Sequence, residues 1–155
     1  VLNPKGDRSE NENTLFDSYL PENPKARHIT VLFEDRSGRV LGGTTDGLFQ
    51  LNEKFEFEHI SLGDSNSDAD RLWITTVLQD RRGVMWIGTN DSKIIRISPA
   101  GNVEQYTTAN DLPDSKISVL FEDAGGQIWA GLRPGNSGGL LRLFADPTAE
   151  NSIVE

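Results

Sequence analysis

The stretch ITVLFEDRSGRVLGGT, residues 29–44, is the first of three similar segments in this chain. ITTVLQDRRGVMWIGT at 74–89 and ISVLFEDAGGQIWAGL at 117–132 align with it over 16 positions without a gap. The copies begin 45 and 43 residues apart. Self-similarity at a nearly fixed period is typical of repeat architectures, so we expect each copy to form the same supersecondary unit.

Each copy predicts two strands joined by a tight turn. An aspartate marks the turn and a glycine follows three residues later, as Asp80 and Gly83 do in the second copy. Such an aspartate accepts backbone N–H bonds, and the glycine can adopt the left-handed conformation that the turn requires. Third apolar segments follow at 48–51, 94–97 and 140–143, and fourth segments at 57–60 and 103–106. The sequence therefore predicts four strands in each unit.

The first strand of each unit is apolar on both faces, which indicates that neighbouring sheets cover it from two sides. In the third copy we expect Ile117, Val119 and Phe121 on one face and Leu120 on the other. Four strands per unit, repeated every 43 to 45 residues, are typical of β-propeller blades. The predicted fold is all-β, with about three four-stranded antiparallel blades that form a partial propeller.

Large and small side chains at fixed positions of the repeat predict how the blades pack. We expect Trp86 and Trp129, with Leu41 as the smaller equivalent, to fill the space between blades. The glycines two residues further on are expected where backbones approach closely, at Gly43, Gly88 and Gly131.

The repeat register also predicts the organisation of the chain as one partial β-propeller over residues 1–155. Residues 1–20 read as the end of a preceding blade, and blades follow over 21–60, 61–106 and 107–155. The last is either complete or lacks part of its fourth strand. Because a ring needs roughly four to eight blades, we expect either further blades in a longer protein or a second copy, paired head to tail into six blades.

Composition and charge exclude several classes of partner. The formal net charge is −9, and the 15 Lys and Arg residues are scattered, which argues against binding to nucleic acid or to an anionic membrane. The chain has no cysteine, so disulfides and thiolate chemistry are excluded. No apolar run approaches the roughly 20 residues that a membrane span needs, and we expect no direct membrane contact.

Three segments carry a family resemblance: VLFEDRSGRVLGGTTDGLFQL, VLQDRRGVMWIGTNDSKIIRI and NDLPDSKISVLFEDAGGQIWAGL. They resemble two-component regulator propeller repeats, in which an apolar strand, a turn aspartate and a Trp-x-Gly-Thr phrase recur. The departures are Leu41 for the tryptophan, Leu132 for the threonine and an insertion at 133–139. The resemblance implies a sensor region on the periplasmic or extracellular side of a bacterial membrane receptor that is coupled to a histidine kinase or another signalling output.

Propeller ligands usually meet the face that is formed by the loops between blades and by the loops between second and third strands. In this chain those loops are 20–28, 61–73 and 107–116, together with 45–47, 90–93 and 133–139. Their polar and aromatic side chains could bind an oligosaccharide or another polar ligand. The candidate binding residues are Arg71, Trp73, Asn90, Asp91, Lys93 and Arg133.

Other motifs favour structural roles, and we expect no catalytic residue, no metal and no cofactor. DSNSDAD at 64–70 has the alternating oxygens of a calcium loop but has Ala69 where the loop needs glycine. The spacing of each turn aspartate to its glycine explains Asp35, Asp80 and Asp123 without catalysis. His28 and His59 lack a partner motif, and we expect Arg81 and Arg82 to be solvated in a turn.

The favoured function is therefore a non-catalytic, ligand-binding sensor segment. The alternatives are a propeller enzyme of the lyase or hydrolase type and a scaffold for protein partners. An enzyme would need two or more titratable groups that converge on the channel, and the repeats supply no such pair.

Overall fold

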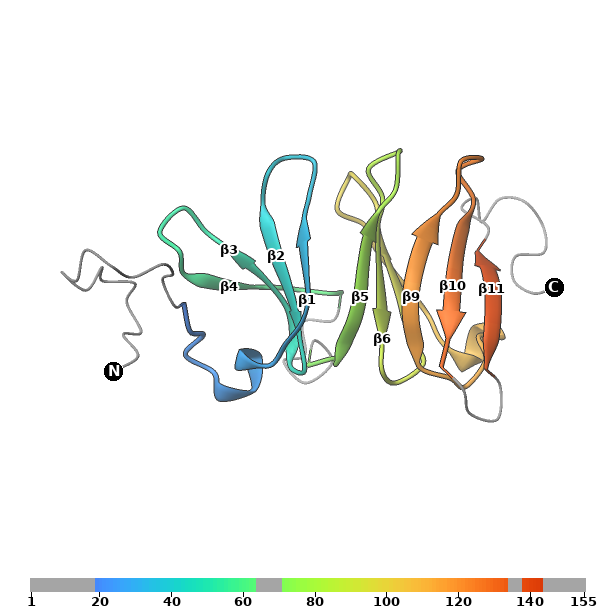
Figure 1. Ribbon diagram of the computed structural model, residues 1–155, viewed down its shortest axis with the longest axis horizontal. Coiled ribbons are helices and arrows are strands. Elements are labelled where there is room, and N and C mark those ends of the chain that lie inside the picture. The colour runs from blue at the N-terminus through green and yellow to red at the C-terminus, as the bar shows by residue number, and fades with distance from the viewer. Residues whose placement is uncertain (1–18, 64–70, 134–137, 144–155) are drawn as a thin grey trace, which may run out of the picture.

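A computed structural model describes residues 19–63, 71–133 and 138–143 of the chain. Three antiparallel sheets lie side by side in chain order (Figure 1). The first contains β1 (Ile29–Glu34), β2 (Val40–Thr44), β3 (Gly47–Leu51) and β4 (Phe57–Ile60). The second contains β5 (Ile74–Gln79), β6 (Met85–Thr89), β7 (Ile94–Ile97) and β8 (Val103–Tyr106). The third contains β9 (Ile117–Glu122), β10 (Ile128–Leu132) and β11 (Gly139–Leu143).

Each sheet is a propeller blade in which consecutive strands pair with one another. The order is β1-β2-β3-β4 in the first blade, β5-β6-β7-β8 in the second and β9-β10-β11 in the third. The first strands β1, β5 and β9 of the three blades lie next to one another (Figure 1). The expected all-β, partial propeller is therefore confirmed. The predicted limits of the blades stay predictions, and residues 1–18 and 144–155 lie outside the described part.

Two short 3-10 helices, η1 (Pro24–Arg27) and η2 (Thr108–Asn110), lie in the segments that lead into the first and third blades. Within the described ranges, no helix is long and apolar enough to cross a membrane.

The hydrophobic core lies between the blades. One cluster fills the space between the first and second blades and includes Leu41, Leu48 and Ile87. The other fills the space between the second and third blades and includes Trp86 and Ile128. Leu41 is fully buried and Trp86 is 1% exposed, so both fill the space between blades as predicted. Trp129 is only half-buried, and its predicted role stays a prediction.

The first strands are covered on both faces only where a described blade lies on each side. That is the case in the second blade, whereas Leu32 of β1 and Phe121 of β9, on the outer faces of the described blades, are 70% and 60% exposed. The prediction was wrong for Ile117, which is buried in the same cluster as Leu120. The β9–β10 register shifts beside Ile117. Such an irregularity turns a side chain to the other face of a strand.

Two glycines lie where neighbouring blades approach most closely, as predicted. A Cβ atom on Gly43 would come within 2.7 Å of the Ile74 side chain, and one on Gly88 within 2.6 Å of the Ile117 side chain. At Gly131 the contact is with Val119 of the same blade. Glycine at the first two positions therefore allows the first strand of the next blade to pack directly on β2 or β6.

We expect Gly88→Ala to lower the free energy of unfolding by about 1–3 kcal/mol, because overpacking of a filled core costs that much. The added methyl group would be 2.6 Å from Ile117 and 2.7 Å from the methyl group of Thr76. Chemical denaturation measures the effect. Gly42→Ala is the control, because its nearest neighbour would be Ile29 at 3.7 Å. Equal stabilities of the two variants would contradict the proposed close approach.

The turn aspartates hold the hairpins together, as predicted. Asp80 accepts hydrogen bonds from the backbone N–H groups of Arg82 and Val84, both at 2.9 Å. Gly83 has a positive φ of 82°, and the glycines in the other two hairpins have similar values. The Trp86 indole also donates to Asp80, at 3.1 Å. The aspartate therefore ties the turn to the aromatic side chain of the following strand.

Candidate functional site

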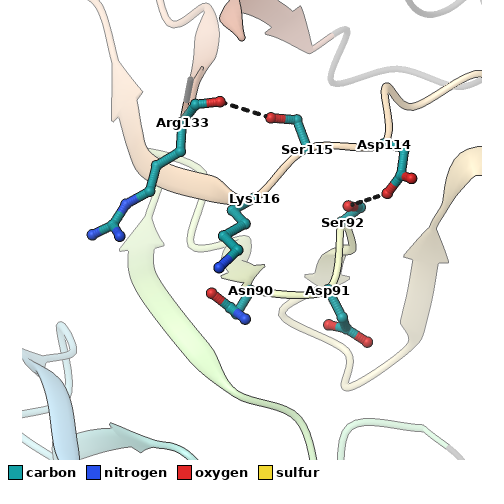
Figure 2. Close-up of a pocket in the computed structure, with 7 residues that line it drawn as sticks. All are labelled: Asn90, Asp91, Ser92, Asp114, Ser115, Lys116 and Arg133. Atoms are coloured by element: carbon teal, nitrogen blue, oxygen red, sulfur yellow. Dashed lines mark hydrogen bonds between the residues drawn. The ribbon is translucent and has the colours of Figure 1, made fainter. Parts of the chain in front are cut away.

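A cavity of about 390 Å³ lies between the second and third blades (Figure 2). It is formed by the turn between β6 and β7, the loop that precedes β9 and the first residue after β10. These are the loop types in which the sequence predicted a ligand site. The lining residues are Asn90, Asp91, Ser92, Asp114, Ser115, Lys116 and Arg133.

Hydrogen bonds between the loops hold the two sides of the cavity together. The Ser92 hydroxyl donates to the Asp114 carboxylate at 2.9 Å and joins the second blade to the third. On the third blade the Ser115 hydroxyl donates to the Arg133 carbonyl, also at 2.9 Å. Ser92 has φ of 61°, a left-handed conformation that residues other than glycine seldom adopt. The cavity walls are therefore fixed by contacts of the chain itself.

The charges that line the cavity are unequally neutralised. Asp91 forms an ion pair with Lys93, with a distance of 2.7 Å between carboxylate oxygen and Nζ. Desolvation by itself would raise the pKa of Asp91, but hydrogen bonds from Lys93 and Thr89 and the Lys93 charge outweigh it and lower that pKa. The cations Lys116 and Arg133, in contrast, form no side-chain hydrogen bond or ion pair with any described residue.

Backbone pairing places these two cations side by side. The Arg133 N–H donates to the Lys116 carbonyl at 2.9 Å, which continues the β9–β10 ladder by one step. In the second blade the equivalent hydrogen bond runs from the Asn90 N–H to the Trp73 carbonyl and extends the β5–β6 ladder in the same way. Figure 2 shows the Lys116 and Arg133 side chains on the same side of this ladder, with Lys116 reaching toward Asn90. The cavity thus presents two cations without an ion-pair partner, together with the Asp114 carboxylate, which accepts a hydrogen bond from the uncharged Ser92 and likewise forms no ion pair with a described residue.

The structure brings together only part of the predicted set. Asn90, Asp91 and Arg133 line the cavity, and Lys93 pairs with Asp91 at its edge. Arg71 and Trp73 do not line the cavity, although Trp73 is 47% exposed. That any of the six candidate residues binds a ligand stays a prediction.

The candidate list omitted four residues that line the cavity: Ser92, Asp114, Ser115 and Lys116. All four lie in loops that were assigned to the ligand face. The alignment of the repeats could have pointed to Lys116, because this residue occupies the position of the candidate residue Trp73 in the preceding unit.

The remaining sequence motifs lie away from the cavity or outside the described part. The calcium-like segment 64–70 lies outside the described residues, and no cluster of three or more metal-binding side chains occurs among the described ones. His28 and His59 are exposed, as predicted. Arg81 and Arg82 are not merely solvated, because they form ion pairs with Glu122 and Asp80.

Comparisons with known proteins support the repeat assignment. The family model described as "Two component regulator propeller" matches residues 70–91, which include β5 and β6. No curated protein matches the chain significantly. The second blade therefore carries a two-component regulator propeller repeat, as the sequence predicted.

Two of the solved structures with the same fold are extracellular domains from B. thetaiotaomicron. The extracellular domain of a hybrid two component system from B. thetaiotaomicron aligns with a TM-score of 0.66 at 20% identity, covering 91% of this chain and 19% of that one. The extracellular domain of a one component system from the same organism gives 0.56 at 22% identity, with 80% and 17% covered.

An enzyme shares the fold as well. Virginiamycin B lyase from Staphylococcus aureus, crystallised as a catalytically inactive variant with quinupristin, gives a TM-score of 0.60 at 21% identity, with 82% of this chain and 41% of the lyase covered. This chain thus spans less than half the length of each of these solved proteins. At these identities the likeness establishes the fold.

Proposed function

We propose that this chain is a non-catalytic, ligand-binding segment of a bacterial signal-transduction receptor, and that it acts on the periplasmic or extracellular side of the membrane. The two-component regulator propeller repeat at residues 70–91 supports the signalling role. The fold shared with extracellular domains of one- and two-component systems supports the location.

The ligand binds in the cavity between the second and third blades. The observation that carries this proposal is the pair of cations Lys116 and Arg133, which form no ion pair with a described residue and lie next to the amide of Asn90. Charge-assisted hydrogen bonds from such groups are stronger than neutral ones. The ligand class that fits best is a polar molecule with an anionic group, such as an acidic oligosaccharide.

A signal follows if the ligand binds the two blades more tightly in one arrangement than in another. The cavity takes Asn90, Asp91 and Ser92 from the second blade and the other four lining residues from the third. A bound ligand therefore contacts both blades and favours the arrangement in which they are correctly spaced. No bond needs to be broken in the propeller, because differential affinity shifts the equilibrium.

Calorimetric titration with trigalacturonic acid, and with a neutral trisaccharide as the reference ligand, tests the proposal. We expect the acidic sugar to bind more tightly than the neutral one. Lys116→Ala and Arg133→Ala should each weaken its binding by about tenfold or more, since a hydrogen bond to a charged group contributes roughly 1.5–3 kcal/mol.

Lys54→Ala is the matched control, because Lys54 is an exposed cation in the turn between β3 and β4. The Lys54→Ala variant should bind both sugars with the same affinities as the unmodified chain. Equal affinity for acidic and neutral sugars, or equal losses in all three variants, would contradict binding at this cavity.

The shared fold with virginiamycin B lyase makes a propeller enzyme the second candidate function. The same titration samples distinguish the two. Mass spectrometry of the sugar after prolonged incubation should show it unchanged if the segment only binds. Conversion that stops when the cavity residues are replaced would favour the enzyme.

A further inference from the structure

An arginine clamps the hairpin turn of the second blade to the hairpin turn of the third. The Arg81 N–H donates to the Glu122 carboxylate at 2.9 Å, and its Nε forms an ion pair with the same group at 2.7 Å. The guanidinium also donates to the carbonyls of Asp123 and Ala124, at 2.6 and 3.1 Å. One residue of the second blade thus makes four contacts to the third, three of them through its side chain.

The same arrangement recurs between the first and second blades. The Arg36 N–H donates to the side-chain oxygen of Gln79 at 2.9 Å, and its guanidinium donates to the Arg81 carbonyl at 2.7 Å. In both cases the arginine directly follows a turn aspartate, and the side-chain acceptor directly precedes the next one. The contact is therefore a property of the repeat and defines which residues face each other when two blades meet.

The first blade presents the accepting half of this contact, and no described residue pairs with it. Glu34 occupies the position of Gln79 and Glu122, is exposed, and has no ion pair or hydrogen bond with a described residue. The apolar residues around it are exposed in the same way. Leu32 is 70% exposed, whereas its equivalents Val77 and Leu120 are 9% and 7% exposed.

The third blade presents an apolar face without the donating half. Val119, Phe121 and Leu140 are 51%, 60% and 64% exposed. Ala124, however, stands where the first two blades have arginine. If a second copy placed its third blade on Glu34, the carboxylate would meet an alanine, and the head-to-tail dimer would lack the clamp that both observed interfaces have.

We propose that the β1 face binds a further propeller blade of the same polypeptide, whose hairpin carries an arginine directly after its turn aspartate. That arginine donates to Glu34 and to the turn carbonyls of the first blade, and the apolar side chains of its sheet cover Ile29 and Leu32. The occupant is not the third blade of a second copy. Continuity with two interfaces of identical pattern carries the proposal. Two of the solved structures with the same fold also extend far beyond the matched part, which covers only 17% and 19% of their chains.

Sedimentation velocity of the 155-residue chain and of Ala124→Arg tests the pairing rule. The unmodified chain should be monomeric at micromolar concentration. Ala124→Arg supplies the missing donor on the third blade, so it should associate at least about tenfold more tightly, the expected gain from a charge-assisted contact. High salt should weaken that association.

Two matched variants show whether Glu34 is the acceptor. Ala124→Gln, which adds length without charge, and the double variant Ala124→Arg with Glu34→Gln should both behave like the unmodified chain. Association that survives Glu34→Gln would overturn the proposal. So would an unmodified chain that is already a stable dimer, because a second copy would then occupy the face.

Arg81→Ala gives an independent measurement within the folded chain. Losing the clamp should raise hydrogen exchange of the amides in the β9–β10 turn, while exchange in the β1–β2 turn stays unchanged. Unaltered exchange in both turns would overturn the role of the arginine. These experiments use no ligand, so a negative result in them does not contradict the proposed ligand site in the cavity. A negative result in the ligand titration, in turn, does not contradict the arginine contact between blades.

Discussion

Replacing Asp80 by alanine is expected to lower the free energy of unfolding by about 3–5 kcal/mol, as loss of a buried charged partner usually does. Asp80 is fully buried and accepts hydrogen bonds from two backbone N–H groups and from the Trp86 indole. Alanine leaves the donors of Val84 and Trp86 buried without an acceptor. Urea denaturation of the 155-residue chain measures the loss.

Asp123→Ala is the matched control. Asp123 makes the equivalent contacts, to the Gln127 N–H at 2.9 Å and the Trp129 indole at 2.8 Å, but these groups are half-buried. Water can replace the lost acceptor there, so we expect the free energy of unfolding to fall by clearly less than in Asp80→Ala. If both substitutions cost the same, burial between blades is not what makes the aspartate important.

The pH dependence of the unfolding free energy shows how much of the Asp80 contribution depends on its negative charge, because Asp80→Asn keeps the shape of the side chain and removes the charge. Burial alone would raise its pKa, but the hydrogen bonds from Trp86, Val84 and Arg82 and the Arg82 charge outweigh burial and lower it below 3.8. A carboxylate with a lowered folded-state pKa stabilises the fold above the unfolded-state pKa near 3.9, and that stabilisation is lost as pH falls through the folded value. The difference between the unmodified chain and Asp80→Asn should therefore narrow below about pH 4.

The repeat pattern predicted the fold because it records interactions that recur in every unit. The turn aspartate, the turn glycine and the glycine of the second strand each serve the same contact in successive blades. Leu41 shows how a departure is accommodated. It cannot donate a hydrogen bond to Asp35, and the Arg39 side chain donates instead, with Nε at 2.7 Å.

The cavity was harder to predict because it lies where the repeats differ. Asn90, Asp91 and Arg133 could be chosen as polar loop residues, but the same reasoning chose Arg71 and Trp73, which the loop geometry does not bring to the cavity. Lys116 precedes a strand and is adjacent to Arg133 only through strand pairing. A single sequence contains no direct record of that pairing, or of which cations lack a carboxylate partner.

The sequence could not predict which faces of β1 and β9 are exposed either. An apolar first strand indicates that neighbours cover it, but it cannot indicate whether those neighbours lie inside the described part. Leu32 and Val77 are therefore equivalent in the sequence repeat, yet 70% and 9% exposed in the structure. The difference between equivalent positions, which only the structure supplies, marks the β1 face as the surface on which we propose that a further blade packs.

Trp86→Ala is expected to lower the free energy of unfolding by about 3–5 kcal/mol, the usual cost of removing a buried aromatic side chain. Trp86 is 1% exposed and lies in the cluster between the second and third blades. The Arg96 guanidinium lies over its ring, 5.9 Å from the centroid. Removing the indole leaves a cavity between the blades and removes one of the hydrogen bonds that Asp80 accepts.

Trp129→Ala provides the control, because Trp129 occupies the same repeat position but is half-buried on the face of the third blade that no described blade covers. We expect a loss of about 1–2 kcal/mol there, in proportion to the smaller apolar area removed from water. The loss of unfolding free energy in Trp86→Leu should lie between those of Trp86→Ala and Trp129→Ala, since Leu41 fills the equivalent position between the first and second blades. Urea denaturation of the three variants in parallel measures the order. If Trp129→Ala cost as much as Trp86→Ala, the stability of the chain would not depend on the tryptophan that lies between two described blades.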